Sequence, residues 1–151
     1  MRALYRGLIA GAVGTMALDI TSYLDMALRG RPSSTTPERT VRRMATSTGV
    51  DLGDGARADN RAAGIGALLG YATGLTVTVA YTGAVREPLP LPRAAAVLTV
   101  AAMLASNAPM TILRITDPRT WSATDWVSDV VPHAAYGVVA AAVDGALRQP
   151  R

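Results

Sequence analysis

Five polar side chains stand inside long apolar stretches of this chain and are its candidates for chemistry: Asp19, Tyr71, Asn107, Asp129 and His133. Ionisable groups are costly to bury in such stretches, so each needs a partner or a function. His133 is the only histidine, and imidazole changes charge between pH 5 and 8, as a proton relay requires. A polar intramembrane cluster built from Asp19 and His133, with the other three in support, would form an ion or proton site.

Two other interpretations of these residues stay open. The five groups could hydrogen-bond one another and only fix the packing of the helices. Asp129 and His133 are four residues apart, a spacing at which two ligands on one helix can bind a divalent metal ion. A single histidine and the absence of cysteine argue against such a site, so we expect no metal ion and no cofactor.

Catalytic motifs are missing from the sequence. There is no cysteine for dithiol chemistry and no Gly-x-Ser-x-Gly nucleophile motif. The glycine-rich stretches follow no strand pattern, so they do not resemble phosphate-binding loops. The balance is against an enzyme.

Four apolar segments must position the polar side chains, at about residues 3–28, 62–85, 91–113 and 127–147. Each has roughly the 20 residues that a helix needs to cross a hydrocarbon core of ~30 Å. Spanning segments satisfy their backbone groups internally, so these segments should be helical. We predict an all-α fold: one membrane domain, residues 1–151, forming a four-helix bundle. The first segment is too long for the apolar part of a signal peptide, and we expect it to stay uncleaved.

Small residues recur every fourth position along the apolar segments. The second segment carries Gly66, Gly70 and Gly74, and the last carries Gly137, Ala141 and Gly145. Such GxxxG-like rows let the backbones of membrane helices approach closely. We therefore predict tight helix packing through these faces.

The polar side chains fall at a similar depth once the segments are taken as helices. Asp19 and Tyr71 would lie roughly 13 Å from the end that faces the polar loop, residues 29–61. Asn107 and His133 would lie roughly 9 Å from the same end. Two prolines beside this level free backbone carbonyls that a polar cluster could satisfy.

The polar loop itself predicts a short helix, at about residues 37–48. Thr36 is the expected N-cap, Pro37 the first helical residue and Glu38 an early acid that suits a helix start. Gly49 should end the helix. The helix could lie on the membrane surface or form an ordinary solvated connector.

Residues that suit the membrane interface flank the apolar segments. Arg39, Arg42 and Arg43 of the short helix could contact lipid headgroups. Trp121 and Trp126 fit the aromatic belt of a membrane protein. Ser122, three residues before Asp125, resembles a capping box that starts the last helix.

The charge pattern also favours lipid over nucleic acid. The net charge is +4, and all fifteen basic residues are arginines. They gather at the ends of the apolar segments, where they would meet headgroups. We expect the lipid bilayer as partner and no nucleic acid.

Two stretches of the chain are similar to a known group of sequences. One is RGLIAGAVGTMALDITSYLDMALRGRP, from Arg6 to Pro32, followed by TPER at Thr36 to Arg39; the other is ITDPRTWSATDWVSDVVPHAAYG, from Ile115 to Gly137. Together they resemble uncharacterised small four-span membrane proteins of actinobacteria. The resemblance implies a multi-pass protein of the bacterial plasma (inner) membrane and no known activity.

The functional expectation follows from the small soluble mass and the small-residue faces. We expect an accessory subunit of a larger membrane complex, without catalytic machinery. The alternative is a small transporter or channel that uses the Asp/His cluster. In either case the chain should associate with itself or with another membrane protein. By architecture alone, the acid in the first span is similar to that of small multidrug-resistance transporters, although the large loop departs from them.

Overall fold

The computed structural model describes residues 2–148. Its elements, in chain order, are α1 (Arg2–Arg29), α2 (Thr36–Thr48), α3 (Gly55–Ala84), α4 (Leu91–Ile112), the 3-10 turn η1 (Pro118–Thr120) and α5 (Ala123–Arg148). The four long helices are long and apolar enough to cross a membrane. The predicted all-α membrane bundle is thus confirmed, and the chain is a multi-pass membrane protein.

Two helices begin earlier than the predicted spans. α3 begins at Gly55 rather than at residue 62, so its first two turns are polar and extend beyond the apolar segment. α5 begins at Ala123 because the capping box forms: the Ser122 amide donates to Asp125 Oδ2 at 2.9 Å. The Asp125 amide in turn donates to Ser122 Oγ at 3.2 Å.

The short helix α2 forms almost where it was predicted. It ends at Gly49, whose left-handed backbone (φ 72°) favours glycine. Its start corrects the prediction by one residue: Thr35 is the N-cap and Thr36 is the first helical residue. Thr35 makes no side-chain capping bond. Two adjacent threonines are equally suited to an N-cap, so the sequence did not distinguish Thr35 from Thr36.

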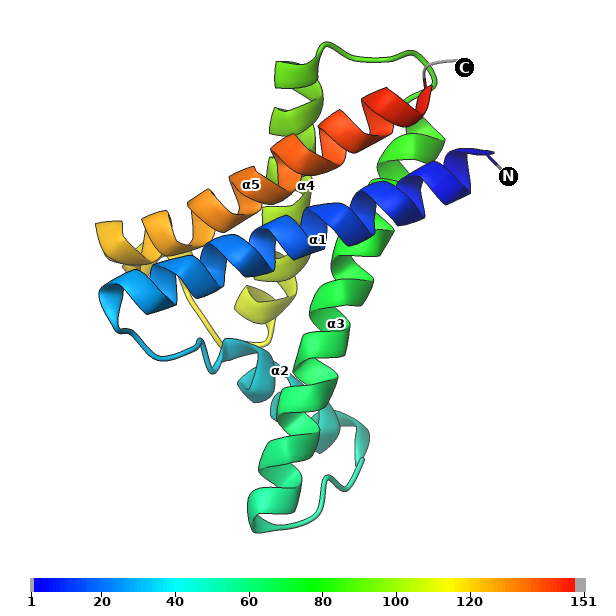
Figure 1. Ribbon diagram of the computed structural model, residues 1–151. Coiled ribbons are helices and arrows are strands. Elements are labelled where there is room, and N and C mark those ends of the chain that lie inside the picture. The colour runs from blue at the N-terminus through cyan, green and yellow to red at the C-terminus, as the bar shows by residue number, and fades with distance from the viewer. Residues whose placement is uncertain (1, 149–151) are drawn as a thin grey trace.

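The long helices pack through three close interfaces and one loose one. Figure 1 shows α1 and α5 side by side, passing across α3 and α4. α1 packs against both α5 and α3, and α5 packs against α4, whereas α3 and α4 contact each other much less. The order around the bundle is therefore α3, α1, α5, α4, and the seam between α3 and α4 is its loosest interface.

Glycines bring the backbones of the paired helices together, as the small-residue rows predicted. A Cβ atom at Gly11 of α1 would lie 2.9 Å from Leu75 Cα of α3. One at Gly137 of α5 would lie 2.5 Å from the Ala95 carbonyl oxygen of α4. The close approach also lets Thr78 Oγ1 donate to the Gly7 carbonyl at 2.8 Å.

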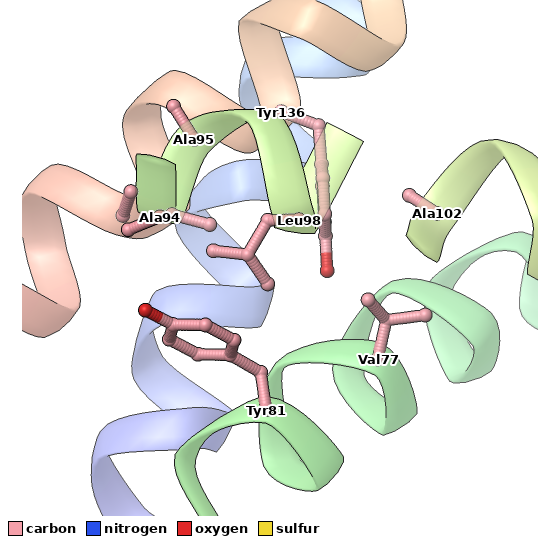
Figure 2. Close-up of a cluster of buried hydrophobic side chains, with 9 residues drawn as sticks. Val77, Tyr81, Ala94, Ala95, Leu98, Ala102 and Tyr136 are labelled. Carbon is pink, nitrogen blue, oxygen red and sulfur yellow. The ribbon is translucent and has the colours of Figure 1, made fainter. Parts of the chain in front are cut away.

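The buried core is small and lies where three helices meet (Figure 2). Val77 and Tyr81 of α3 face Leu98 of α4, beside small side chains. Tyr136 of α5 is 1% exposed, and its hydroxyl donates to the Gly74 carbonyl of α3 at 2.6 Å. Large apolar side chains such as Leu28 and Ile112 instead face outward, at 85% and 80% exposure. Apolar residues outside and small residues inside suit a lipid environment.

An ion network closes the bundle at the end opposite the polar loop. Asp144 of α5 is buried, and its two carboxylate oxygens accept from Arg6 Nε at 2.9 Å and Arg148 Nε at 2.7 Å. Arg148 also donates to the carbonyls of Val85 and Arg86, at 2.9 and 3.0 Å, just beyond α3. Asp144, an intramembrane acid, is thus fully paired.

Candidate functional site

The five predicted site residues lie in two separate hydrogen-bonded groups. Tyr71 OH donates to Asp19 Oδ2 at 2.9 Å, which joins α3 to α1. Asn107 Nδ2 donates to Asp129 Oδ2 at 2.9 Å, which joins α4 to α5. In the described part of the chain no hydrogen bond links Asp19 to His133, so the two groups do not form the single pair that the proton-relay hypothesis assumed.

His133 is bonded through both ring nitrogens. Nδ1 lies 2.7 Å from the Asp129 carbonyl oxygen, and because a carbonyl only accepts, Nδ1 carries a proton. Nε2 lies 3.2 Å from Ser106 Oγ of α4, and the same hydroxyl is 3.0 Å from the Ala102 carbonyl.

This arrangement accommodates both charge states of the ring. In the neutral ring the Ser106 hydroxyl can donate to Nε2. In the imidazolium it can accept from Nε2–H and donate to Ala102 instead. The Asp129 carboxylate, 3.5 Å from Nδ1, adds a negative charge beside the ring. The Ser106 hydroxyl can therefore serve Nε2 either as a donor or as an acceptor.

A cavity of about 570 Å³ lies beside both hydrogen-bonded groups. Asp19, Tyr71 and His133 belong to its lining, whereas Asn107 and Asp129 do not. The other lining side chains, which come from α1 to α5, are Thr15, Leu18, Tyr23, Pro37, Glu38, Thr40, Met44, Ala63, Gly66, Ala67, Leu69, Gly70, Thr73, Gly74, Ala102, Ala105, Ser106, Pro109, Met110 and Tyr136. Its volume is in the range of small-molecule sites.

The seam between α3 and α4 continues this cavity toward the bundle surface. A second hollow, of about 260 Å³, lies along the seam. Leu69, Thr73 and Ala105 line both hollows. Leu69 is 37% exposed, so the wall that the two hollows share reaches the surface of the bundle.

The charged lining of the cavity is acidic. Apart from tyrosines, the ionisable lining residues within the described part of the chain are Asp19, Glu38 and His133. None of the fourteen arginines within residues 2–148 belongs to the lining. The cavity thus offers two carboxylates and one imidazole in an otherwise apolar and hydroxyl-bearing wall.

Glu38 is the site residue that the sequence analysis missed. It was interpreted only as an acid that suits the start of a helix, but its side chain lines the cavity and its Oε2 is buried with no hydrogen-bond partner. Val41 and Ala45, three and seven residues further on, are buried as well. That spacing places all three on one helix face, and it was the available signal.

The same buried face shows how α2 is held against the bundle. The helix is docked on α3, since a Cβ atom at Gly66 of α3 would lie 3.0 Å from Pro37 Cβ. Arg42 pairs with Asp59 of α3. Arg39 and Arg43 are exposed on the outer side.

The two tryptophans lie between η1 and the first turns of α5. Their ring centroids are 5.0 Å apart in an edge-to-face arrangement. Trp121 Nε1 donates to Thr116 Oγ1 at 2.8 Å, and Trp126 is 42% exposed. Lipid contacts of these rings, and of the arginines on α2, remain predictions.

Within residues 2–148 no three side chains of His, Asp or Glu gather as a metal site would require. Asp129 and His133, the pair with metal-ligand spacing, have Asn107 and Ser106 as their polar neighbours. The chain matches no family model, no curated protein and no solved structure in sequence or fold comparisons.

Proposed function

We propose that this protein is a small membrane transporter that binds a lipophilic organic cation between α3 and α4. The observation that carries the proposal is the cavity itself, whose lining among residues 2–148 holds two carboxylates and no arginine. Asp19 lies in a membrane-spanning helix, where an ionised carboxylate is expensive, so an acid kept there favours an ion as ligand. A cation would supply the missing opposite charge.

The shape of the site favours an apolar ligand over a hydrated ion. Small and apolar side chains such as Ala67, Ala102 and Met110 make up most of the wall. The opening along the α3–α4 seam faces the side of the bundle, where a lipophilic molecule could enter from the bilayer. A cation with apolar bulk satisfies both the acids and the wall.

His133 gives the site a means of coupling to protons. A proton on its ring places a positive charge on the wall of the same cavity and would repel a cation. Loss of that proton, which Ser106 accommodates, would restore binding. Proton release and cation uptake would therefore go together.

The test uses tetraphenylphosphonium as the cation and the full chain in lipid nanodiscs. Calorimetry should give saturable binding, and Asp19→Asn should weaken it about tenfold or more, because a charge close to the ligand is lost. Asp117→Asn makes the same chemical change outside the cavity, in the exposed pair with Arg119, and should leave the affinity unchanged. Absence of binding by the unmodified protein, or equal losses in both variants, would refute the proposal.

An accessory-subunit role is the second candidate, and uncovered glycines favour it. A Cβ atom at Gly64, Gly83 or Gly145 would meet nothing within 4 Å. Small residues on an outer face suit contact with another helix. Native mass spectrometry of the protein extracted from its host membrane separates the two candidates: a stoichiometric partner supports the accessory role, and a homo-oligomer supports the transporter.

We also propose the bacterial plasma membrane as the location. The similarity of the two stretches, residues 6–39 and 115–137, to small membrane proteins of actinobacteria supports it. Fractionation of host cells that express the chain with a tag would test it, and a signal in any other membrane fraction would contradict it.

A further inference from the structure

Glu38 is the ionisable cavity group that no residue within 2–148 pairs with. Asp19 accepts a hydrogen bond from the Tyr71 hydroxyl, and both ring nitrogens of His133 have hydrogen-bond partners. Glu38 Oε2, by contrast, is buried and has no hydrogen-bond partner among the described residues. Leaving a buried carboxylate oxygen without a partner costs free energy. A positively charged group in the cavity would offset this cost.

We infer that Glu38 is the residue that receives the positive charge of the ligand, so that α2 is part of the binding site. This inference rests on the proposed function and adds to it a specificity-determining residue from the polar loop. The ligand class is an organic cation whose charged centre lies at the α2 end of the cavity, with its apolar bulk toward the α3–α4 seam.

The docking of α2 fixes the position of this carboxylate. Pro37, the neighbour of Glu38, lies against Gly66 so closely that a Cβ there would be 3.0 Å from Pro37 Cβ and 3.2 Å from its carbonyl carbon. Thr40 and Val41 are buried on the same side, at 8% and 4% exposure. The acid is therefore held on a packed helix rather than on a free loop.

The comparison of Glu38→Gln with Glu87→Gln tests the inference. Both substitutions remove one carboxylate and keep the side-chain shape, but Glu87 is exposed in the turn between α3 and α4 and is not part of the lining. With tetraphenylphosphonium and nanodisc-embedded protein, Glu38→Gln should raise the Kd about tenfold or more. Glu87→Gln should not change it.

A second measurement separates a binding role from a structural one. Because the carboxylate is unpaired, the empty Glu38→Gln protein should be as resistant to thermal unfolding as the unmodified protein, or more so. The stabilisation that the cation adds should shrink in this variant. A Glu38→Gln protein that fails to fold, or one that binds as tightly as the unmodified chain, would overturn the inference. In the second case the proposed function would still stand, whereas failure of the unmodified protein to bind would remove both.

Discussion

Replacement of Gly137 by alanine tests the helix packing directly. A Cβ atom at this position would lie 2.5 Å from the Ala95 carbonyl oxygen and 2.8 Å from the Thr99 amide nitrogen, both in the backbone of α4. Real Cβ atoms do not approach so closely, and backbone atoms cannot rotate away as the end of a flexible side chain can. The Gly137→Ala variant can form only if α4 and α5 move apart.

Gly145 on the same helix provides the matched control, because a Cβ atom there would meet nothing within 4 Å. Alanine gains about 1 kcal/mol over glycine in a helix interior, and this gain applies to both variants and cancels in their difference. What remains is the cost of overpacking, which is about 1–3 kcal/mol. We expect a value near the upper end, because the obstructing atoms belong to the backbone.

The measurement is the free energy of unfolding of each variant in bicelles, obtained by steric trapping or by titration with denaturing detergent. Gly145→Ala should equal or exceed the unmodified protein in stability, and Gly137→Ala should lie about 1–3 kcal/mol below Gly145→Ala. Equal stabilities for the two variants would show that α4 and α5 do not meet through Gly137. The order of helices around the bundle would then be wrong.

Three further outcomes follow from the contacts. Asp144→Asn should cost about 3 kcal/mol in the same unfolding assay, because two arginines lose their carboxylate in a mostly buried place. Tyr136→Phe should cost about 1 kcal/mol through loss of the bond to the Gly74 carbonyl, and an unchanged stability would contradict that bond. The side-chain and backbone hydrogen bonds from Arg119 hold the pKa of Asp117 below its usual value. NMR titration should therefore show the pairing present above that lowered pKa and lost as the pH falls through it, and Arg119→Gln should move the pKa of Asp117 upward.

Segment length and hydropathy were sufficient to predict the membrane helices, whereas their pairing was not predictable. The row of Gly66, Gly70 and Gly74 shows why. Gly66 meets Pro37 of α2 and Gly74 meets Thr15 of α1, whereas a Cβ atom at Gly70 between them would meet nothing within 4 Å, and Gly70 lines the cavity. A row of small residues indicates that another segment packs closely there, but the crossing of the helices decides which segment it is.

The candidate site was predictable in depth and not in connectivity. Depth along a helix follows from counting residues, and Asp19, Tyr71 and His133, which were expected at a similar depth, line one cavity. Which side chains bond depends on helix rotation and on nearer competitors. Asp19 is bonded to Tyr71, and Nε2 of His133 is bonded to Ser106. Glu38 escaped notice because its sequence context has an ordinary explanation, the start of a helix.

The network around Asp144 has a consequence for the order of assembly. α1 and α3 can pair through their glycine faces as soon as both have left the ribosome, since chains emerge N-terminal part first. Arg6 and the carbonyls that follow α3 then still lack their partners, because Asp144 and Arg148 are both on α5. An insertion intermediate with α1 to α4 therefore keeps an uncompensated arginine and uncapped carbonyls at one end. The entry of α5 supplies both missing partners in one step, because Asp144 and Arg148 lie one helical turn apart on that helix.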